Sequence, residues 1–143
     1  VIERLVSVFP ADEQPGVRRQ LALVLKAVVC QHLLLADGRV AERDARDDGR
    51  RRRVVASEVL RVTPAVANLV AMGRSSQIYS AMESGQQVGM QTLEQDLARL
   101  WHQGEISEAS AMAHARNPGI VQDRVARLRG TGAGSRSNRG GNR

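Results

Sequence analysis

The chain has 143 residues, a formal net charge of +6 and a sequence pI near 11.1. Its length suits one domain, and its 42% hydrophobic content argues against wholesale disorder. A single cysteine, Cys30, excludes an intramolecular disulfide and every multi-cysteine zinc site. Three aromatic residues, Phe9, Tyr79 and Trp101, are too few for recognition of single-stranded nucleic acid by base stacking.

The positive charge is confined to the C-terminal end. Residues 1–115 contain fourteen basic and fourteen acidic residues, whereas residues 116–143 contain seven arginines and one aspartate. The body of the protein is therefore neutral, and the high pI describes its tail.

The N-terminal part predicts two helices and a hairpin. Ile2, Leu5, Val6 and Phe9 are spaced as one helical face before a proline. A second helix, capped by Asp12 or Gln14, is predicted to continue to about residue 28. A buried strand over 28–35 and a second strand over 53–62 then enclose a solvated, charge-rich loop over 36–52.

Two strands alone do not make a stable sheet. Their near-continuous apolar character predicts cover on both faces, as in α/β proteins. We therefore expect the remaining strands in a part of the protein that this chain lacks.

The C-terminal half predicts a series of short helices. Thr63 caps the first, with Pro64 at its first position, and Gly73 ends it. Further helices are predicted over 75–83, 90–103, 108–115 and 120–128. Gly104 follows the second of these, and Ser107 caps the third. The Gly/Ser/Asn/Arg-rich segment 130–143 is predicted to be disordered.

Few residues carry recognisable chemistry. The sequence has no phosphate-binding G-x-x-x-x-G-K-[ST] loop, and His32, His102 and His114 lack the spacing of metal ligands. Cys30 is interpreted as a core residue. Arg50 to Arg53 could bind anions through their guanidinium groups, but the nearby carboxylates favour a solvated loop.

Four stretches resemble the C-terminal part of the PilT family, the type IV pilus retraction (twitching motility) ATPases. Residues 2–10 resemble I-D-R-I-V-D-V-F-P, and residues 17–34 resemble V-R-x-Q-L-A…V-V-S-Q-R-L-L. Residues 53–65 resemble R-V-A-A-x-E-I-L…T-P-A, and residues 77–95 resemble Q-I-x-S-x-I…G-M-Q-T-L-D-Q. Gly104 to Ser107 and Asn117-Pro118 continue the match in order.

The resemblance implies an α/β fold, the C-terminal portion of a RecA-like P-loop ATPase domain. It divides the chain into the end of the ATPase core (1–62), a helical subdomain (63–128) and a disordered Arg/Gly tail (129–143). The intact protein would be a cytoplasmic hexamer that binds ATP and Mg2+. It would lie at the inner membrane and contact the platform protein of the pilus.

The resemblance also implies roles for particular residues. The family's P-loop, acidic boxes and His box lie upstream of this segment, so we expect no catalytic residue, metal site or ATP hydrolysis in this chain alone. Arg4, just after the His box, and Arg53, at the start of the last core strand, are expected to touch nucleotide. Their alternatives are a surface ion pair for Arg4 and loop solvation for Arg53.

Two family motifs have counterparts here. The G-M-Q-T motif corresponds to Gly89, Met90, Gln91 and Thr92. The retraction motif A-I-R-N-L-I-R-E corresponds to eight residues that lack both arginines and the glutamate: Ala65, Val66, Ala67, Asn68, Leu69, Val70, Ala71 and Met72. A motor task other than retraction is therefore possible, as is a helix that needs only its apolar face.

Three functions are weighed. The order of the motifs favours an ATPase motor fragment. The alternatives are a non-catalytic interaction fragment and a nucleic-acid-binding module with a basic tail. The neutral body disfavours the last, so we expect no specific nucleic-acid partner.

Overall fold

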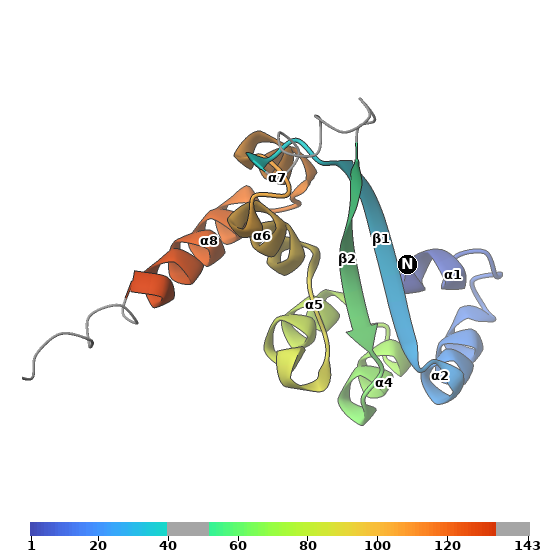
Figure 1. The fold of residues 1–143 in the computed structure, drawn as a ribbon. Helices are drawn as coiled ribbons and strands as arrows, with labels where there is room; N and C mark the ends of the chain where they lie inside the picture. Colours follow the sequence, from blue (N-terminus) through green and yellow to red (C-terminus); the bar gives the residue numbers. More distant parts are fainter. Residues whose placement is uncertain (40–51, 134–143) are drawn as a thin grey trace, which may run out of the picture. The chain divides into compact units, whose positions relative to one another are not determined.

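A computed structural model describes residues 1–39 and 52–133, with the side chains of 131–133 left out (Figure 1). It contains two compact units, Val1–Cys30 with Ser57–Thr92 and Gln31–Ala56 with Leu93–Arg143. Each strand of the hairpin contributes to both units. The division at residue 62 stays a prediction.

The predicted hairpin is present as β1 (Ala27–Leu35) and β2 (Arg53–Arg61). Backbone hydrogen bonds at its two ends, Val62 N to Lys26 O and Ala36 N to Arg52 O, both 2.9 Å long, indicate one unbroken antiparallel register.

In the described part of this chain, the cover predicted for both faces of the strands is present on one face only. Burial alternates along β1, where Leu34 is buried while Val29 and Leu33 are 57% and 58% exposed. Alternation of this kind means that one face packs on a core and the other does not. Among the described residues nothing buries that second face.

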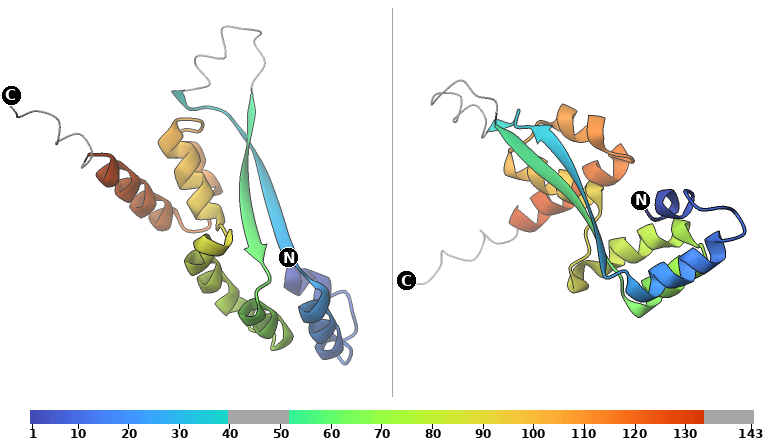
Figure 2. Two further views of the ribbon diagram at one scale, coloured as in Figure 1. Left: turned by 60° about the horizontal axis from the view of Figure 1, so that its bottom comes forward. Right: turned by 90° about the vertical axis from the view of Figure 1, so that its right-hand side faces the viewer.

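The first unit contains five helices: α1 (Ile2–Val6), α2 (Gln14–Val24), α4 (Pro64–Ala71), α5 (Ser75–Ser84) and the 3-10 helix η1 (Gly85–Val88). Helices α2 and α4 lie side by side (Figure 2). The unit's core consists of seven buried apolar side chains: Ile2, Leu60, Val66, Val70, Ile78, Met82 and Met90.

Two predicted helices are shorter than expected. Helix α1 ends at Val6, so Phe9 lies outside it and is 42% exposed. Helix α2 follows Glu13 instead of a capping Asp12 or Gln14, because the Pro10 carbonyl accepts hydrogen bonds from both Glu13 N and Gln14 N. It ends at Val24, where the chain becomes extended before β1.

The second unit contains α6 (Leu93–Gln103), α7 (Glu108–His114) and α8 (Pro118–Ala133). Its core lies between these helices and the strand residues next to the loop. It consists of eleven buried side chains: Leu34, Val54, Ala56, Leu93, Leu97, Ala98, Leu100, Ile106, Ala111, Val121 and Val125. The packing of α6 against α8 is its most extensive helix contact.

The sequence located several helix ends correctly. Thr63 Oγ1 accepts a hydrogen bond from Val66 N at 3.3 Å, and Ser107 Oγ accepts one from Ser110 N at 3.1 Å. Gly73 and Gly104 take positive φ values of 68° and 76° after α4 and α6, a conformation that glycine adopts without strain.

Two predictions fail near the C-terminus. Helix α6 begins at Leu93, not at Met90, because Gln91 pairs with a strand. Helix α8 runs to Ala133, so the segment 129–133 is helical where disorder was predicted. The predicted disorder of 134–143, and most of the predicted solvated loop 36–52, fall outside the described residues.

Candidate functional site

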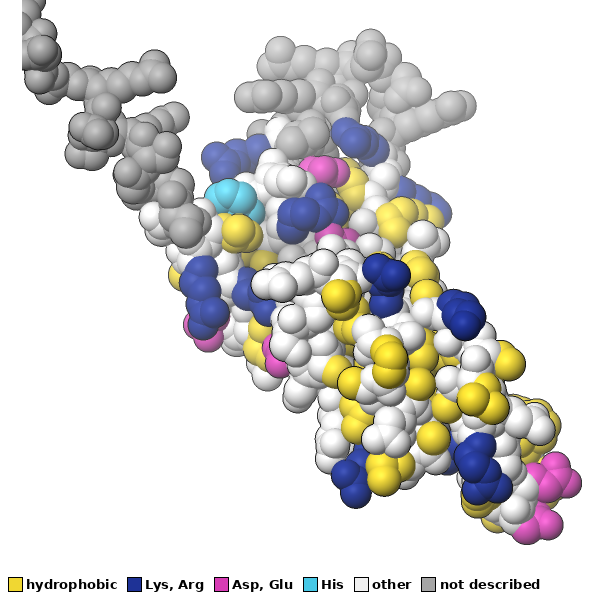
Figure 3. Space-filling view, turned by 90° about the horizontal axis from the view of Figure 1, so that it is seen from below, with side chains coloured by type: hydrophobic (Ala, Val, Ile, Leu, Met, Phe, Trp, Pro, Cys, Tyr) yellow, Lys and Arg dark blue, Asp and Glu magenta, His cyan; other side chains and the backbone are white. Residues whose placement is uncertain are grey.

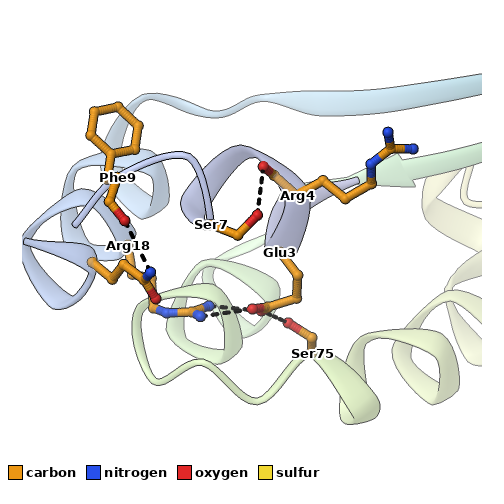
Figure 4. A network of polar contacts seen from close by, with 7 residues as sticks. Glu3, Arg4, Ser7, Phe9, Arg18 and Ser75 are labelled. Carbon is orange, nitrogen blue, oxygen red and sulfur yellow. Dashed lines mark hydrogen bonds and ion pairs between the residues drawn. The ribbon is translucent and has the colours of Figure 1, made fainter. Parts of the chain in front are cut away.

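A polar network joins α1, α2 and the start of α5. Arg18 donates two hydrogen bonds of 2.7 Å to the two carboxylate oxygens of Glu3, and Ser75 Oγ donates to the same carboxylate. Figure 4 shows the Glu3 carboxylate between the Arg18 guanidinium and Ser75. Gly73 adjoins the same guanidinium, since a Cβ at Gly73 would lie 3.5 Å from its central carbon. The network therefore fixes one turn of α1 against two other helices.

The network also sets the charge state of its members. The hydrogen bonds from Arg18, and secondarily from Ser75, lower the pKa of Glu3 from 4.5 to about 2. The hydrogen bonds to Glu3 in turn raise the pKa of Arg18. Glu3 therefore keeps its negative charge to lower pH than a free glutamate does.

Arg4, a predicted nucleotide contact, lies next to this network but outside it. Its residue is exposed, and its side chain points away from Glu3 and Arg18 (Figure 4). Its backbone carbonyl accepts a hydrogen bond from Ser7 Oγ at 3.1 Å. Among the described residues its guanidinium forms no ion pair, so the alternative interpretation as a surface ion pair finds no partner there.

Arg53, the second predicted nucleotide contact, is the first residue of β2 and is exposed. Its neighbour Val54 is buried, so strand alternation directs the two side chains to opposite faces. Arg4 belongs to the first compact unit and Arg53 to the second. Each exposed guanidinium group carries the hydrogen-bond donors that phosphate binding requires.

The counterpart of the retraction motif lies on α4. Val66 and Val70 are each 1% exposed and belong to the core, whereas Ala65 and Asn68 are exposed. Met72, which occupies the position of the motif's glutamate, is 57% exposed. Figure 3 views the helices at the bottom of Figure 1 from below and shows exposed hydrophobic side chains among basic ones.

The G-M-Q-T counterpart holds the end of the first unit to β2. Gln91 and Val59 exchange backbone hydrogen bonds of 2.8 and 2.9 Å, and Gln91 Nε2 donates to the Ser57 carbonyl at 3.0 Å. Met90 and Thr92 are buried, and Gly89 takes a φ of 80°. In this chain Gln91 forms a single antiparallel bridge to β2, which the helical spacing of 90–103 did not predict.

A second polar junction, in the other unit, was also missed from the sequence. The Asp37 carboxylate accepts hydrogen bonds from Ser107 N and Ser107 Oγ, both 2.7 Å long, at the start of α7. Gly38 N donates to the Glu105 carbonyl at 3.3 Å. A Cβ on Gly38 would lie 2.6 Å from the carbonyl carbon of Gly104, so only glycine fits there. The base of the charged loop is thereby fixed.

Helix α6 buries polar side chains that its pattern did not mark. Glu94 and Asp96 are 0% and 2% exposed. Glu94 Oε1 accepts a hydrogen bond from Arg116 N at 3.2 Å, and Asp96 pairs with Arg99 Nε at 2.7 Å. Every buried side-chain nitrogen or oxygen in the described part of the chain has a partner, as buried polar groups require.

Within the described residues, 1–39 and 52–133, the structure supports neither a metal site nor a membrane-spanning helix. No group of three or more His, Cys, Asp or Glu side chains there could hold a metal ion. No helix there is long and apolar enough to cross a membrane.

Comparisons with known proteins support the sequence interpretation, although no family model matches the chain. It is 39% identical over 116 residues to a twitching motility protein of Neisseria gonorrhoeae. It is 39% identical over 114 residues to the type IV pilus ATPase PilU, and 37% identical over 119 residues to the retraction ATPase PilT, both of Pseudomonas aeruginosa. These matches cover 80–82% of this chain but only 27–30% of the relatives.

Solved structures agree on the fold. The crystal structure of the pilus retraction motor PilT with bound ADP matches 85% of this chain with a TM-score of 0.66 and 30% identity, and 30% of that protein is covered. The ATPase DotB of Legionella pneumophila matches 78% of this chain, and 27% of DotB, with a TM-score of 0.56 and 22% identity, which supports the fold alone.

The hairpin with its helices is therefore an α/β segment of an ATPase fold, as predicted. More particularly, the chain is a homologue of the type IV pilus ATPases PilT and PilU over about four fifths of its length, which confirms the resemblance to the PilT family. It spans less than a third of the length of these relatives.

Proposed function

We propose that this chain is the C-terminal part of an ATP-driven motor of the PilT type, which acts in type IV pilus retraction. The observation that carries the proposal is the 39% identity over 116 residues to a protein named for twitching motility. The structural match to the PilT motor with bound ADP supports it.

In the intact motor the chain would form part of each subunit of a hexamer. The motor would bind ATP and Mg2+, lie at the cytoplasmic face of the inner membrane and contact the platform protein of the pilus. Arg4 and Arg53 would each donate hydrogen bonds to nucleotide, Arg53 near the base edge. Neither guanidinium forms an ion pair with a described residue, so neither would have to break one in order to bind nucleotide.

The hairpin supports the proposal that the sheet extends into an upstream part of the motor. The exposed side chains on one face of β1 include Val29, Leu33 and Leu35, which are 45–58% exposed. An apolar sheet face of this kind is normally covered in α/β proteins. Alone, the chain would act as an interaction fragment without ATP turnover, because its sequence has no phosphate-binding loop.

The altered motif on α4 favours a motor with weak retraction or another task. Ala67, Ala71 and Met72 replace two arginines and a glutamate of the family motif. The loss removes three charged groups, while the apolar residues that α4 buries are retained.

A chimera tests the proposal directly. The matching segment of Pseudomonas aeruginosa PilT is replaced by residues 1–119 of this chain, and ATP hydrolysis and twitching are measured in cells lacking PilT. We expect a hexamer with ATPase activity but reduced twitching. A well-folded hexamer without ATPase activity would contradict the proposal.

Substitutions within the chimera test the individual residues. Arg4→Gln and Arg53→Gln are each expected to lower kcat/KM for ATP by about tenfold or more, as loss of a charged hydrogen bond to phosphate would. Arg19→Gln, on the exposed surface of α2, is the matched control and should leave kcat/KM unchanged. Restoring the motif through Ala67→Arg, Ala71→Arg and Met72→Glu should increase twitching without a matching increase in ATPase activity.

A further inference from the structure

Helix α8 carries an apolar stripe that continues beyond the body of its unit. Val121, Val125 and Leu128 are spaced i, i+4, i+7, so they share one helical face. The first two are 0% and 1% exposed, whereas Leu128 is 41% exposed. Residues 126–130 are all exposed, and in Figure 1 the red end of α8 lies away from α6 and α7.

Arginines surround the exposed end of this stripe. Arg124 is half-buried one turn before Leu128, and Arg127 and Arg129 flank it in the sequence and are exposed. The Arg129 guanidinium of α8 lies 5.2 Å from the centre of the Trp101 ring of α6, a cation–π contact that positions the Arg129 side chain. We name Arg124, Arg127, Leu128 and Arg129 the basic end of α8.

The basic end lies within the part of the sequence that carries the net positive charge. Residues 1–115 have no net charge, and the whole excess of +6 lies in residues 116–143. A helix that combines arginines with an exposed apolar side chain at its end fits a surface with negative headgroups above an apolar layer.

We propose that the basic end of α8 binds an anionic phospholipid surface. The arginines would contact the headgroup phosphates, and Leu128 would enter the boundary with the acyl chains. This extends the proposed membrane-side location of the motor to a particular surface of this chain, and it does not depend on ATP turnover.

A lipid surface fits better than a nucleic acid. A groove for single-stranded nucleic acid would combine basic residues along a folded face with aromatic side chains for stacking. The neutral body supplies no basic excess, and Trp101, next to this helix, already contacts Arg129. The exposed Leu128 has a role at a membrane boundary and none on a phosphate backbone.

Vesicle co-sedimentation with the full 143-residue chain tests the inference. The vesicles contain phosphatidylcholine with or without phosphatidylglycerol, and a single-stranded RNA oligonucleotide serves as the competing ligand. We expect binding only to vesicles with phosphatidylglycerol, at physiological ionic strength, and weaker binding as salt is raised.

Charge-matched variants locate the surface. Each arginine near an anionic membrane contributes roughly a fivefold increase in affinity, so Arg124→Gln, Arg127→Gln and Arg129→Gln together should weaken binding on the order of tenfold to a hundredfold. The control Arg19→Gln, Arg39→Gln and Arg74→Gln removes the same charge from exposed positions elsewhere and should change affinity by less than about twofold. Leu128→Ser should weaken binding about threefold.

Three outcomes would overturn the inference: equal binding to vesicles without phosphatidylglycerol, equal loss in the control variant, or tighter binding to RNA than to vesicles. Circular dichroism of each variant distinguishes loss of binding from loss of folding. None of these outcomes touches the proposed motor function, which the chimera measures through ATPase activity.

Discussion

The two compact units join distant segments of the chain through different kinds of polar contact. Each must hold together segments about 70 residues apart in the sequence, Glu3 with Ser75 in one unit and Asp37 with Ser107 in the other. The first uses an ion pair on a half-exposed carboxylate, with Glu3 50% exposed. The second uses a carboxylate on a helix N-terminus and a glycine that touches backbone.

The two units are therefore expected to differ in how strongly substitutions affect their stability. Helix α2 of the first unit contains no buried residue, whereas α6 of the second buries seven of its eleven. Surface ion pairs contribute little to stability, but tightly packed cores tolerate little change. The second unit should therefore respond more strongly to substitution.

The largest expected effect is in the core of α6. Leu97 is 0% exposed, so Leu97→Ala should lower the free energy of unfolding by about 3 kcal/mol or more through lost burial and a cavity. Leu23→Ala, at a position 79% exposed, is the matched control and should change it by less than about 0.5 kcal/mol. Urea denaturation measures both, and equal effects would refute the contrast.

The next effect concerns the glycine contact. Gly38→Ala should lower the free energy of unfolding by about 2–3 kcal/mol, because the Cβ would overlap the backbone of Gly104. Gly16→Ala in α2 has open space around its Cβ and should stabilise by up to about 1 kcal/mol. A harmless Gly38→Ala would show that the close approach is absent in solution.

Smaller effects are expected at the helix caps. Ser107→Ala removes the cap of α7 and the one hydrogen bond that its hydroxyl donates to Asp37, and should lower the free energy of unfolding by about 1–2 kcal/mol. Thr63→Ala removes a single 3.3 Å cap and should lower it by about 1 kcal/mol or less. If thermal unfolding gave the reverse order, the Asp37 junction would contribute nothing.

The smallest effect is at the ion pair. Because the folded pKa of Glu3 is depressed from 4.5 to about 2, its contribution is present above pH 4.5 and is lost as the pH falls through that window. Solvent screening limits it to about 1 kcal/mol or less. Glu3→Gln should therefore flatten the stability of the chain between pH 4.5 and 2, and high salt should reduce the difference from the unsubstituted protein.

Much of the fold could be predicted from local patterns. The hairpin strands, the Thr63 and Ser107 caps and the glycine at the end of α6 were predicted correctly, because each depends on neighbouring residues. Residues 90–92 were wrongly predicted as helical, because the helical spacing of the apolar residues from Leu93 onward extends back to Met90. The pairing of Gln91 depends on Val59, 32 positions earlier.

Some residues of the candidate site could also be predicted from the sequence, whereas others could not. Arg4 and Arg53 were selected by motif position, which identifies residues but not their surroundings. The Glu3–Arg18 pair could not be found, since two charged residues 15 positions apart have no periodic relation. The buried Glu94 and Asp96 were missed because the pattern of a helix records which residues are apolar, not which polar ones find partners.

Local spacing and residue order were enough to predict the kinds of element, several of their ends, the location of the charge and the relationship to pilus ATPases. Only the tertiary structure shows that one apolar face of the hairpin is exposed and that Asp37 accepts hydrogen bonds from the start of α7. It also shows that Arg127 and Arg129 of α8 lie beyond its buried residues Val121 and Val125. Those features arise from contacts between distant segments, whose energies no local pattern contains.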